Sequence, residues 1–449
     1  MKLHTFKIGG VHPAENKIAA GKPIENVPLP QEVVLPVAQH IGAPAKPIVQ
    51  KGDKVKRGDR VAEAGGFVSA HIHTPISGTV TKIDTCRTPQ GMPVTAIFIK
   101  SDEADRQADA ETIANQKPIR SDVEVSILEP KQIISLIQDA GIVGLGGATF
   151  PTHVKLSPPP GMKADVVIIN AVECEPCLSC DDMLMREHPA EIVKGVQLLM
   201  RAAGVNHGII AIENNKPEAI EAMSKVVAKV AGIEVMPMKV KYPQGGEKQL
   251  IEAVIGKEVP SGALPIATGA IVQNVATAYA VYRAVYLGEP ILDRVLTLHD
   301  GKEGRNLRVA LGTMLDTLIP EGTEYEKIIL GGPMMGRTAS TLATPMIKGN
   351  SGILLDPVYA HRGEVEPCIR CGKCQDACPM GLEPFLLSTL SRLKDYDEAE
   401  NQKIANCIEC GSCSYACPAN RPVVDYIRIG KAKVMAAMRA RAAAAAPKK

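Results

Sequence analysis

Two short runs near the C-terminal end of the chain hold eight of its 12 cysteines. They read Cys368-Ile-Arg-Cys371-Gly-Lys-Cys374-Gln-Asp-Ala-Cys378-Pro379 and Cys407-Ile-Glu-Cys410-Gly-Ser-Cys413-Ser-Tyr-Ala-Cys417-Pro418. Both match the spacing C-x2-C-x2-C-x3-C-P, in which thiolates ligate cubane iron–sulfur clusters. The spacing therefore predicts two [4Fe–4S] clusters, and two clusters so close in sequence indicate electron relay.

In this kind of motif the fourth cysteine of each run ligates the other cluster. One predicted ligand set is therefore Cys368, Cys371, Cys374 and Cys417, and the other is Cys407, Cys410, Cys413 and Cys378. Glycine after the second cysteine of each run permits the close backbone approach that a cluster requires. Zinc also takes four thiolates, but zinc motifs lack the longer last gap followed by proline.

The second segment whose residues could bind a ligand is a glycine-rich stretch, Gly141-Ile-Val-Gly144-Leu-Gly146-Gly147-Ala-Thr-Phe150-Pro151. Glycines let backbone N–H groups approach a phosphate closely. The stretch follows a predicted helix over 130–140 and lacks the third glycine of the dinucleotide fingerprint. On the residues alone, phosphate binding and a plain tight turn therefore both remain open.

Polar side chains follow this stretch at places where a ligand crevice could open. Lys155 could meet a phosphate, and Asn170 ends an apolar segment that reads as a strand. In an α/β sheet, ligands bind outside the carboxyl ends of the strands. Glu173 and Glu175 come next, and 242–247, Tyr-Pro-Gln-Gly-Gly-Glu, repeats the arrangement after another predicted strand.

The central part of the chain alternates between apolar strand-like and amphipathic helix-like segments. Strands are predicted over 164–170, 207–212 and 233–240, and helices over 182–203, 217–230, 247–254 and 274–287. This alternation predicts an α/β domain with a mostly parallel sheet. Short strands over 294–298, 306–309 and 327–330 then predict a small β-rich domain.

Residues 45–100 resemble the flattened barrel of biotinyl and lipoyl carrier domains. Two Gly-Asp turns separate short valine-rich strands over 49–61, and Pro-Ile-Ser-Gly-Thr-Val follows at 75–80. Such carriers attach their prosthetic group to a lysine at the tip of the central hairpin. Because 62–76 contains no lysine, we expect a structural or docking version of the barrel.

The composition excludes other classes of protein. The net charge is +2, and aromatic residues make up 3% of the chain, with no tryptophan. The chain therefore lacks the positive field and the stacking platforms typical of nucleic-acid binding. No stretch approaches the roughly 20 apolar residues that span a bilayer, and the first ten residues lack the apolar run of a signal peptide. We expect a cytoplasmic protein whose membrane association comes through partners.

Three motifs together resemble the FMN- and NADH-binding subunit of respiratory complex I. They are Gly-Leu-Gly-Gly-Ala-Thr-Phe-Pro-Thr-x-x-Lys at 144–155, Asn-Ala-Val-Glu-Cys-Glu-Pro at 170–176 and Tyr-Pro-Gln-Gly-Gly-Glu-Lys at 242–248. The opening Phe-Lys-Ile-Gly-Gly-Val-His-Pro-Ala-Glu-Asn-Lys at 6–17 brings the match closer to the C subunits of Rnf electron-transport complexes. The order of the segments carries this resemblance over nearly the whole chain.

The resemblance implies an FMN held without a covalent bond, with NADH stacked above it. Phe150 would face the adenine of NADH, with Glu175 and Glu247 nearby. The implied cofactor-binding residues are Gly144, Gly146, Gly147, Phe150, Lys155, Asn170, Glu173, Glu175, Gly245, Gly246, Glu247 and Asn274. The chain departs from the complex I pattern at Val172 and Gly246, where complex I has acids, and at Pro158, where it has an aromatic residue. FMN would take a hydride and release electrons singly, so no catalytic acid or nucleophile is expected.

The resemblance also divides the chain into segments. They are a biotinyl/lipoyl-like barrel without a carrier lysine (1–100), a linker (101–120), an FMN/NADH-binding α/β domain (121–290), a small β-grasp-like domain (291–350), a two-cluster ferredoxin-like helical module (361–426) and a basic, alanine-rich tail (427–449).

The predicted function is electron input to an ion-translocating NADH:ferredoxin oxidoreductase. The resemblance implies membrane-embedded, iron–sulfur and flavin subunits as partners, ferredoxin as an indirect partner, and a peripheral place on the cytoplasmic side of the membrane. A soluble cobalamin reductase shares this layout, although the opening signature favours Rnf. A third alternative is a relay subunit whose flavin site is empty. Only its cofactor content would distinguish it from the Rnf subunit and the cobalamin reductase.

A third cysteine group remains open at the sequence level. Cys174, Cys177 and Cys180 form C-x2-C-x2-C, and Cys86 could add a fourth thiolate. The group lacks the terminal Cys-Pro, so a third metal site and free or buried thiols are both compatible with it.

Overall fold

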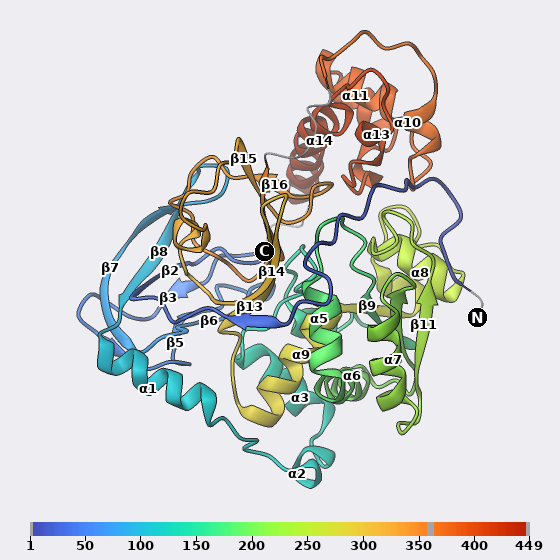
Figure 1. The fold of residues 1–449 in the computed structure, drawn as a ribbon. Helices are drawn as coiled ribbons and strands as arrows, with labels where there is room; N and C mark the ends of the chain where they lie inside the picture. The colour runs from blue at the N-terminus through green and yellow to red at the C-terminus, as the bar shows by residue number, and fades with distance from the viewer. Residues whose placement is uncertain (1–2, 357–362, 446–449) are drawn as a thin grey trace.

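The computed structural model describes residues 3–356 and 363–445. A barrel, an α/β domain, a β-rich domain and a helical cysteine module follow one another along the chain (Figure 1). The first two residues of the predicted module 361–426 and the last four of the predicted tail lie outside the described residues. The predicted multidomain α/β architecture is confirmed.

The α/β domain is built on four parallel strands in the order β11-β10-β9-β12. They are β9 (Val166–Ala171), β10 (Gly208–Glu213), β11 (Ile233–Met238) and β12 (Ala270–Asn274). Alternate residues of β9 face opposite layers, because Val167 and Ile169 join one apolar core while Val166 and Ile168 join another. The sheet is therefore covered on both faces, as its continuous apolar strands predict.

The helices of this domain are α3 (Pro130–Asp139), α4 (Thr152–Lys155), α5 (Cys180–Glu187), α6 (Pro189–Ala203), α7 (Pro217–Val227), α8 (Glu247–Ile255) and α9 (Val275–Tyr282). The single helix expected over 182–203 is two helices. They meet at His188, because Pro189 cannot continue the hydrogen bonding of α5 but fits the first position of α6.

The strand order reverses between β9 and β12. The chain passes from β9 to β10 and β11 on one side of the sheet and then returns to place β12 on the other side of β9. Asn170 of β9 and Asn274 of β12 lie opposite each other in the register, at the carboxyl ends of their strands. A reversal of this kind opens a ligand crevice, and the sequence had shown no strand at 270–274.

The N-terminal barrel consists of a four-stranded sheet and a three-stranded sheet. Its strands are β2 (Glu32–Pro36), β3 (Lys46–Pro47), β4 (Lys54–Val55), β5 (Arg60–Glu63), β6 (Ile72–His73), β7 (Gly78–Arg87) and β8 (Pro93–Lys100). Residues before β2 do not belong to these sheets. Strand β1 (Ile24–Asn26) pairs with a strand of the β-rich domain instead.

The segment expected to be a linker, 101–120, contains helix α1 (Glu103–Ala114). The Asp109 carboxylate of this helix accepts hydrogen bonds from Ser77 N at 2.6 Å and Ser77 Oγ at 2.7 Å. Polar contacts, which apolar periodicity does not reveal, thus hold the helix on the barrel. The short helix α2 (Asp122–Ser126) follows it.

The β-rich domain is a six-stranded sheet in the order β1-β14-β13-β17-β15-β16. Its later strands are β13 (Asp293–His299), β14 (Gly304–Ala310), β15 (Lys327–Leu330), β16 (Arg337–Thr338) and β17 (Gly352–Asp356). All three predicted strands are present. Strand β17 lies beyond the expected end of the domain at 350 and pairs with β13 in the centre of the sheet.

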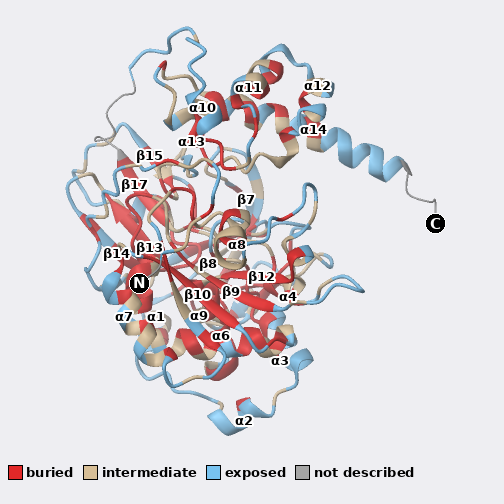
Figure 2. Ribbon diagram, turned by 90° about the vertical axis from the view of Figure 1, so that its right-hand side faces the viewer, coloured by how far each residue is buried: buried red, intermediate tan, exposed pale blue. Residues whose placement is uncertain are grey.

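The cysteine module is helical. Its helices are α10 (Lys373–Asp376), α11 (Pro384–Leu393), α12 (Tyr396–Asn401), α13 (Ser412–Tyr415) and α14 (Val423–Ala445). Ile427 and Val434 of α14 are each 1% exposed and pack into the module core. The first part of the predicted tail therefore belongs to the module, while the far end of α14 projects from it and is exposed (Figure 2).

Short turns of 3-10 helix are η1 (Pro265–Thr268), η3 (Leu315–Leu318) and η4 (Ile404–Asn406), and a π-helical turn, η2 (Arg283–Leu287), continues α9. Within the described ranges, no helix combines the length and apolar character needed to cross a membrane.

A buried lysine joins three parts of the fold. Lys348, between β16 and β17 of the β-rich domain, is 0% exposed and donates hydrogen bonds from Nζ to the carbonyl of His71 in the barrel at 2.6 Å and of Gly141 in the α/β domain at 2.7 Å. Both acceptors are uncharged. Burial lowers the pKa of Lys348 to about 7.

Stability should depend on pH through this lysine. In the unfolded chain Lys348 titrates near its usual pKa of about 10.4, so between about pH 7 and pH 10 the unfolded state binds more protons and wild-type stability rises with pH. We expect the anaerobic thermal midpoint of the wild type, relative to Lys348→Met, to increase from pH 7 to pH 9. The exposed Lys229→Met is the control, and a wild-type advantage that stays constant across this range would contradict the prediction.

Candidate functional site

The two asparagines at the strand reversal are held by the loops and helices around them. Asn170 donates from Nδ2 to the Gly245 carbonyl at 2.8 Å. Asn274 caps α9, because its Oδ1 accepts from Ala276 N at 2.8 Å, and its Nδ2 donates to Asp181 Oδ2 at 2.8 Å. The carboxyl edge of the sheet is therefore lined by amide groups in fixed orientations.

The glycine-rich loop lies against this edge. Gly144 N donates to the Phe150 carbonyl at 2.8 Å and closes the neck of the loop. Gly146 and Gly147 are exposed at its tip. A Cβ at Gly146 would lie 3.2 Å from Asn274 Cβ, so the tip and the asparagine are in direct contact. The loop thus offers backbone N–H groups next to the crevice.

Lys155 and Glu247 form an ion pair beside strand β12. Lys155 Nζ contacts Glu247 Oε1 at 2.7 Å and donates to the Val272 carbonyl at 3.0 Å. Glu247 begins α8, and the capping residue before it, Gly246, has no side chain to cover the first N–H groups. The start of α8 therefore adds a second potential anion-binding element near a cation.

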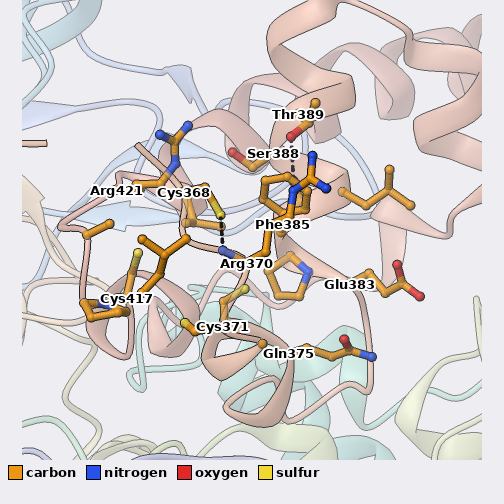
Figure 3. Close-up of a pocket in the computed structure, with 18 residues that line it drawn as sticks. Cys368, Arg370, Cys371, Gln375, Glu383, Phe385, Ser388, Thr389, Cys417 and Arg421 are labelled. Atoms are coloured by element: carbon orange, nitrogen blue, oxygen red, sulfur yellow. Dashed lines mark hydrogen bonds between the residues drawn. The ribbon is translucent and has the colours of Figure 1, made fainter. Parts of the chain in front are cut away.

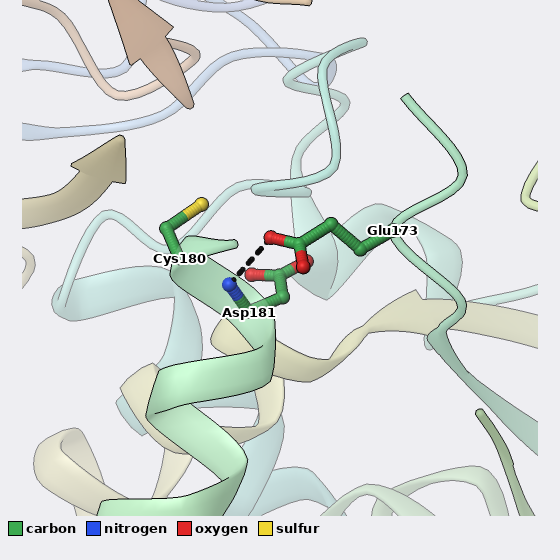
Figure 4. Close-up of side chains that lie close together, drawn as sticks. All are labelled: Glu173, Cys180 and Asp181. Carbon is green, nitrogen blue, oxygen red and sulfur yellow. Dashed lines mark hydrogen bonds between the residues drawn. The ribbon is translucent and has the colours of Figure 1, made fainter. Parts of the chain in front are cut away.

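The side chain of Glu173, which lies on the loop after β9, points to the start of α5 (Figure 4). Its Oε1 accepts from Asp181 N at 2.8 Å. Burial first, and then the Glu173 charge, raise the pKa of Asp181 to about 6. Glu173, Cys180 and Asp181 are the one trio of potential ligand side chains that the described residues place within reach of a single ion. Cys180 directs its thiol to the Ser351 carbonyl.

The three cysteines 174, 177 and 180 do not converge on one ion. Cys174 Sγ accepts from Gly245 N at 3.3 Å, the Cys180 thiol contacts the Ser351 carbonyl, and among the described residues no group of ligand atoms within reach of one ion contains two of these cysteines. Burial raises the pKa of Cys180 well above that of a free thiol. Of the two interpretations left open by the sequence, the geometry favours free or buried thiols, with Cys177 and Cys180 buried and Cys174 partly buried.

Glu175, one of the predicted nucleotide residues, is bound by a turn of the β-rich domain. Its carboxylate accepts from Met334 N at 3.0 Å and from Met335 N at 2.8 Å, and burial raises its pKa to about 7. A Cβ at Gly332 would lie 2.2 Å from Glu175 Oε2. The glycine turn of the β-rich domain thus closes over this carboxylate, and the Tyr242 hydroxyl lies 3.5 Å from Glu175 Oε1.

The eight cysteines of the two runs separate into two cavities. The larger, with a volume of about 460 Å³, is lined by Cys368, Cys371, Cys374 and Cys417 (Figure 3). The smaller is lined by Cys378, Cys407, Cys410 and Cys413. Each cavity therefore contains three cysteines of one run and the last cysteine of the other, which is the grouping that a two-cluster motif requires.

Backbone N–H groups already point at the thiols. Arg370 N donates to Cys368 Sγ, and Glu409 N donates to Cys407 Sγ, both at 3.4 Å. Arg370 and Glu409 have positive φ angles of 54° and 59°, which bend each loop around its cysteines. Hydrogen bonds to sulfur are one of the means by which proteins tune cluster potentials, so the donor set fits cubane clusters.

The two cavities differ in exposure. Cys371 of the larger cavity is exposed, whereas Cys378, Cys410 and Cys413 of the smaller cavity are buried. The smaller cavity adjoins the α/β domain, since Tyr242 donates from its hydroxyl to the Cys410 carbonyl at 2.7 Å. We call the smaller the inner cavity and the larger the outer cavity.

Sequence reasoning missed two residues that organise this region. Tyr242 lies in a motif that was recognised, but its contact with Cys410 joins positions 168 residues apart. Asp181, the partner of Asn274, follows Cys180, and only the cysteine was considered as a possible ligand. An acid directly before an expected helix start was the available signal.

Comparison with known proteins identifies each part of the chain. Residues 4–104 match the family model of the RnfC barrel sandwich hybrid domain, 137–283 that of the Nuo51 FMN-binding domain, and 362–418 that of the 4Fe-4S dicluster domain. The agreement covers the barrel, the crevice and both cysteine cavities.

Whole-chain relatives extend the match. The C subunit of the proton-translocating ferredoxin:NAD(+) oxidoreductase complex of Clostridium ljungdahlii is 46% identical over 97% of this chain and 95% of its own length. The C subunit of the Na(+)-translocating complex of Acetobacterium woodii is 41% identical over 98% and 99%. The C subunit of the ion-translocating oxidoreductase complex of Rhodobacter capsulatus is 41% identical over 96% and 84%. The chain therefore belongs to the RnfC family, the C subunits of ion-translocating oxidoreductase complexes.

Proposed function

We propose that this chain exchanges electrons between NADH and further subunits of an ion-translocating ferredoxin:NAD+ oxidoreductase complex, through FMN and two [4Fe–4S] clusters. The observation that carries the proposal is the arrangement of the three sites. The Tyr242–Cys410 hydrogen bond joins the loop at the strand reversal to the buried inner cavity, and the outer cavity, formed by the same two cysteine runs, is more exposed.

The crevice residues fit FMN. The exposed tip of the glycine loop and the uncapped start of α8 supply N–H groups for a phosphate, and Lys155 supplies a positive charge. Asn170 and Asn274 supply amide groups for the polar edge of a flavin ring. Further binding residues are Gly144, Gly146, Gly147, Glu173, Gly245 and Gly246. When bound, FMN would supply hydride acceptance from NADH and release of single electrons.

NADH would lie above this crevice. Phe150 and Glu247 are only partly buried, so they are accessible to a nucleotide. The Lys155–Glu247 pair is also partly exposed, with 27% and 38% of the two side chains accessible, so it can rearrange when anions bind. Glu175, which the resemblance also places near NADH, is held by the turn at Met334 and Met335.

The inner cavity would hold one cluster on Cys378, Cys407, Cys410 and Cys413, and the outer cavity the other on Cys368, Cys371, Cys374 and Cys417. A hydride brings two electrons, and each cluster can accept one, with NAD+ and a proton as the other products. The inner cluster is the neighbour of the crevice, and the outer one is accessible to a partner protein of the complex. Membrane association would come from those partners, on the cytoplasmic side.

Titration with NADH tests the whole proposal. In the full chain, reconstituted anaerobically with iron, sulfide and FMN, NADH should bleach the flavin absorbance and produce the paramagnetic signal of reduced clusters. Dithionite is the control for cluster competence. Clusters that dithionite reduces but NADH does not, in a chain that binds no flavin, would leave electron relay alone as the function.

Lys155→Met should weaken FMN binding. A hydrogen bond to a charged group contributes about 1.5–3 kcal/mol, so we expect the Kd to rise by roughly tenfold or more. Quenching of FMN fluorescence measures the Kd, and Lys229→Met serves as the matched lysine control. Equal affinity in Lys155→Met and the wild type would exclude this lysine from the binding site.

Paired cysteine variants test the ligand sets. Cys378→Ser with Cys407→Ser removes two ligands of the inner cluster alone, so we expect about half of the iron and one intact cluster signal. Cys374→Ser with Cys378→Ser damages both clusters, and nearly all the iron should be lost. The reverse pattern would show that each run ligates its own cluster.

A further inference from the structure

The opening segment of the chain contacts both the crevice and the inner cavity. Residues 4–17, which we call the N-terminal strap, pass the edge of the α/β sheet near β11 and α8 and reach the cysteine module before turning to β1 (Figure 1). The strap contains the motif Phe-Lys-Ile-Gly-Gly-Val. Neither FMN binding nor cluster ligation accounts for this motif.

The strap pairs with the α/β domain through its backbone. Lys239 N donates to the His4 carbonyl at 2.8 Å. Val11 and Tyr242 exchange two hydrogen bonds, from Val11 N to the Tyr242 carbonyl at 2.8 Å and from Tyr242 N to the Val11 carbonyl at 2.9 Å. Tyr242 opens the loop that carries Gly245 to Asn170. The strap therefore fixes the start of a crevice loop.

Two glycines of the strap lie directly on the inner-cavity loop. Gly10 N donates to the Ala377 carbonyl at 3.0 Å. A Cβ at Gly9 would lie 2.4 Å from the Cys378 carbonyl oxygen, closer than any real side chain approaches. Gly9 also has a φ of +67°, which favours glycine. The chain thus brings bare backbone against a predicted cluster ligand.

The far end of the strap is anchored on the loop after β9. Lys17 Nζ donates to the carbonyls of Glu173 and Glu175, each at 3.0 Å, and to that of Leu178. This loop carries Glu173 at the crevice. One lysine therefore satisfies three backbone carbonyls of this loop.

We propose that the strap is a positioning element that holds the inner cluster at a fixed separation from the flavin crevice. Val11, Tyr242, Ala377 and Cys410 share one apolar cluster, so the strap, the crevice loop and the inner-cavity loops pack as a unit. The Tyr242 hydroxyl bond to Cys410 closes the same unit from the other side. This inference rests on the proposed function, because it assigns the strap a role in transfer between those two sites.

Gly9→Ala tests the strap, with Gly204→Ala as a matched control. Both glycines have nearly the same φ, +67° and +69°, but a Cβ at Gly204 meets nothing within 4 Å. The backbone strain is therefore equal, and the clash with Cys378 is specific to Gly9. In the reconstituted full chain, FMN content, iron content and the rate of flavin reduction by NADH should match the wild type in both variants.

Electron transfer from flavin to the inner cluster should separate the two variants. We expect rapid freezing with paramagnetic resonance to show a rate lowered by roughly tenfold or more in Gly9→Ala alone, because small displacements of reacting groups have large kinetic effects. Hydrogen exchange of the peptide around 375–381 should be faster in Gly9→Ala alone. Equal transfer and exchange in Gly9→Ala and Gly204→Ala would overturn the proposal.

Two further outcomes remain decisive. If Gly9→Ala loses iron, Lys17→Met is the variant to test instead, since it adds no Cβ against Cys378. An unchanged rate of electron transfer and unchanged hydrogen exchange at 173–178 in Lys17→Met would then refute the proposed role of the strap. If the wild type itself binds no flavin, the proposed function fails. The exchange comparison at 375–381 would still show whether the strap holds the cluster loop.

Discussion

The hydrogen bond from the Tyr242 hydroxyl to the Cys410 carbonyl is the contact on which the functional arrangement depends. Tyr242 is 2% exposed, and burial raises the pKa of its phenol well above the usual value, so the hydroxyl remains a donor. A buried hydroxyl without its acceptor would cost about 1–3 kcal/mol. The contact therefore favours one placement of the cysteine module on the α/β domain, with the inner cavity next to the crevice.

A buried ionic network fixes the other domains in a similar way. Arg283 pairs with Glu289 and with Asp293, each at 2.7 Å, and Arg57 of the barrel reaches Glu289. Arg308 of the β-rich sheet completes the network on Asp293. The neighbouring guanidinium groups hold the pKa of Asp293 far below its usual range. Removing one partner from such a network costs about 3–5 kcal/mol, so the barrel and the β-rich domain have a defined position beside the crevice.

Rigid placement suits electron exchange better than it suits carrier chemistry. A lipoyl or biotinyl domain moves its lysine-bound group between sites, but 62–76 has no lysine and the barrel is tied to the α/β domain through Lys348 and Arg57. With its sites fixed, the chain relies on distance and orientation, and the cofactors supply the chemistry.

The sequence by itself determined the features that depend on local spacing. The cysteine runs predicted the grouping that the two cavities show, and the alternation of apolar and amphipathic segments predicted the strands β9, β10 and β11, although not β12 beside Asn170. Tertiary structure alone decided what depends on distant partners. Helix α1 is held by Asp109 on Ser77, Glu175 is bound by the turn at Met334, and Gly9 meets Cys378 from the opposite end of the chain. Each of these is a polar or steric contact between separate segments, and such contacts leave no periodic signal in the sequence because they are satisfied only when the domains come together.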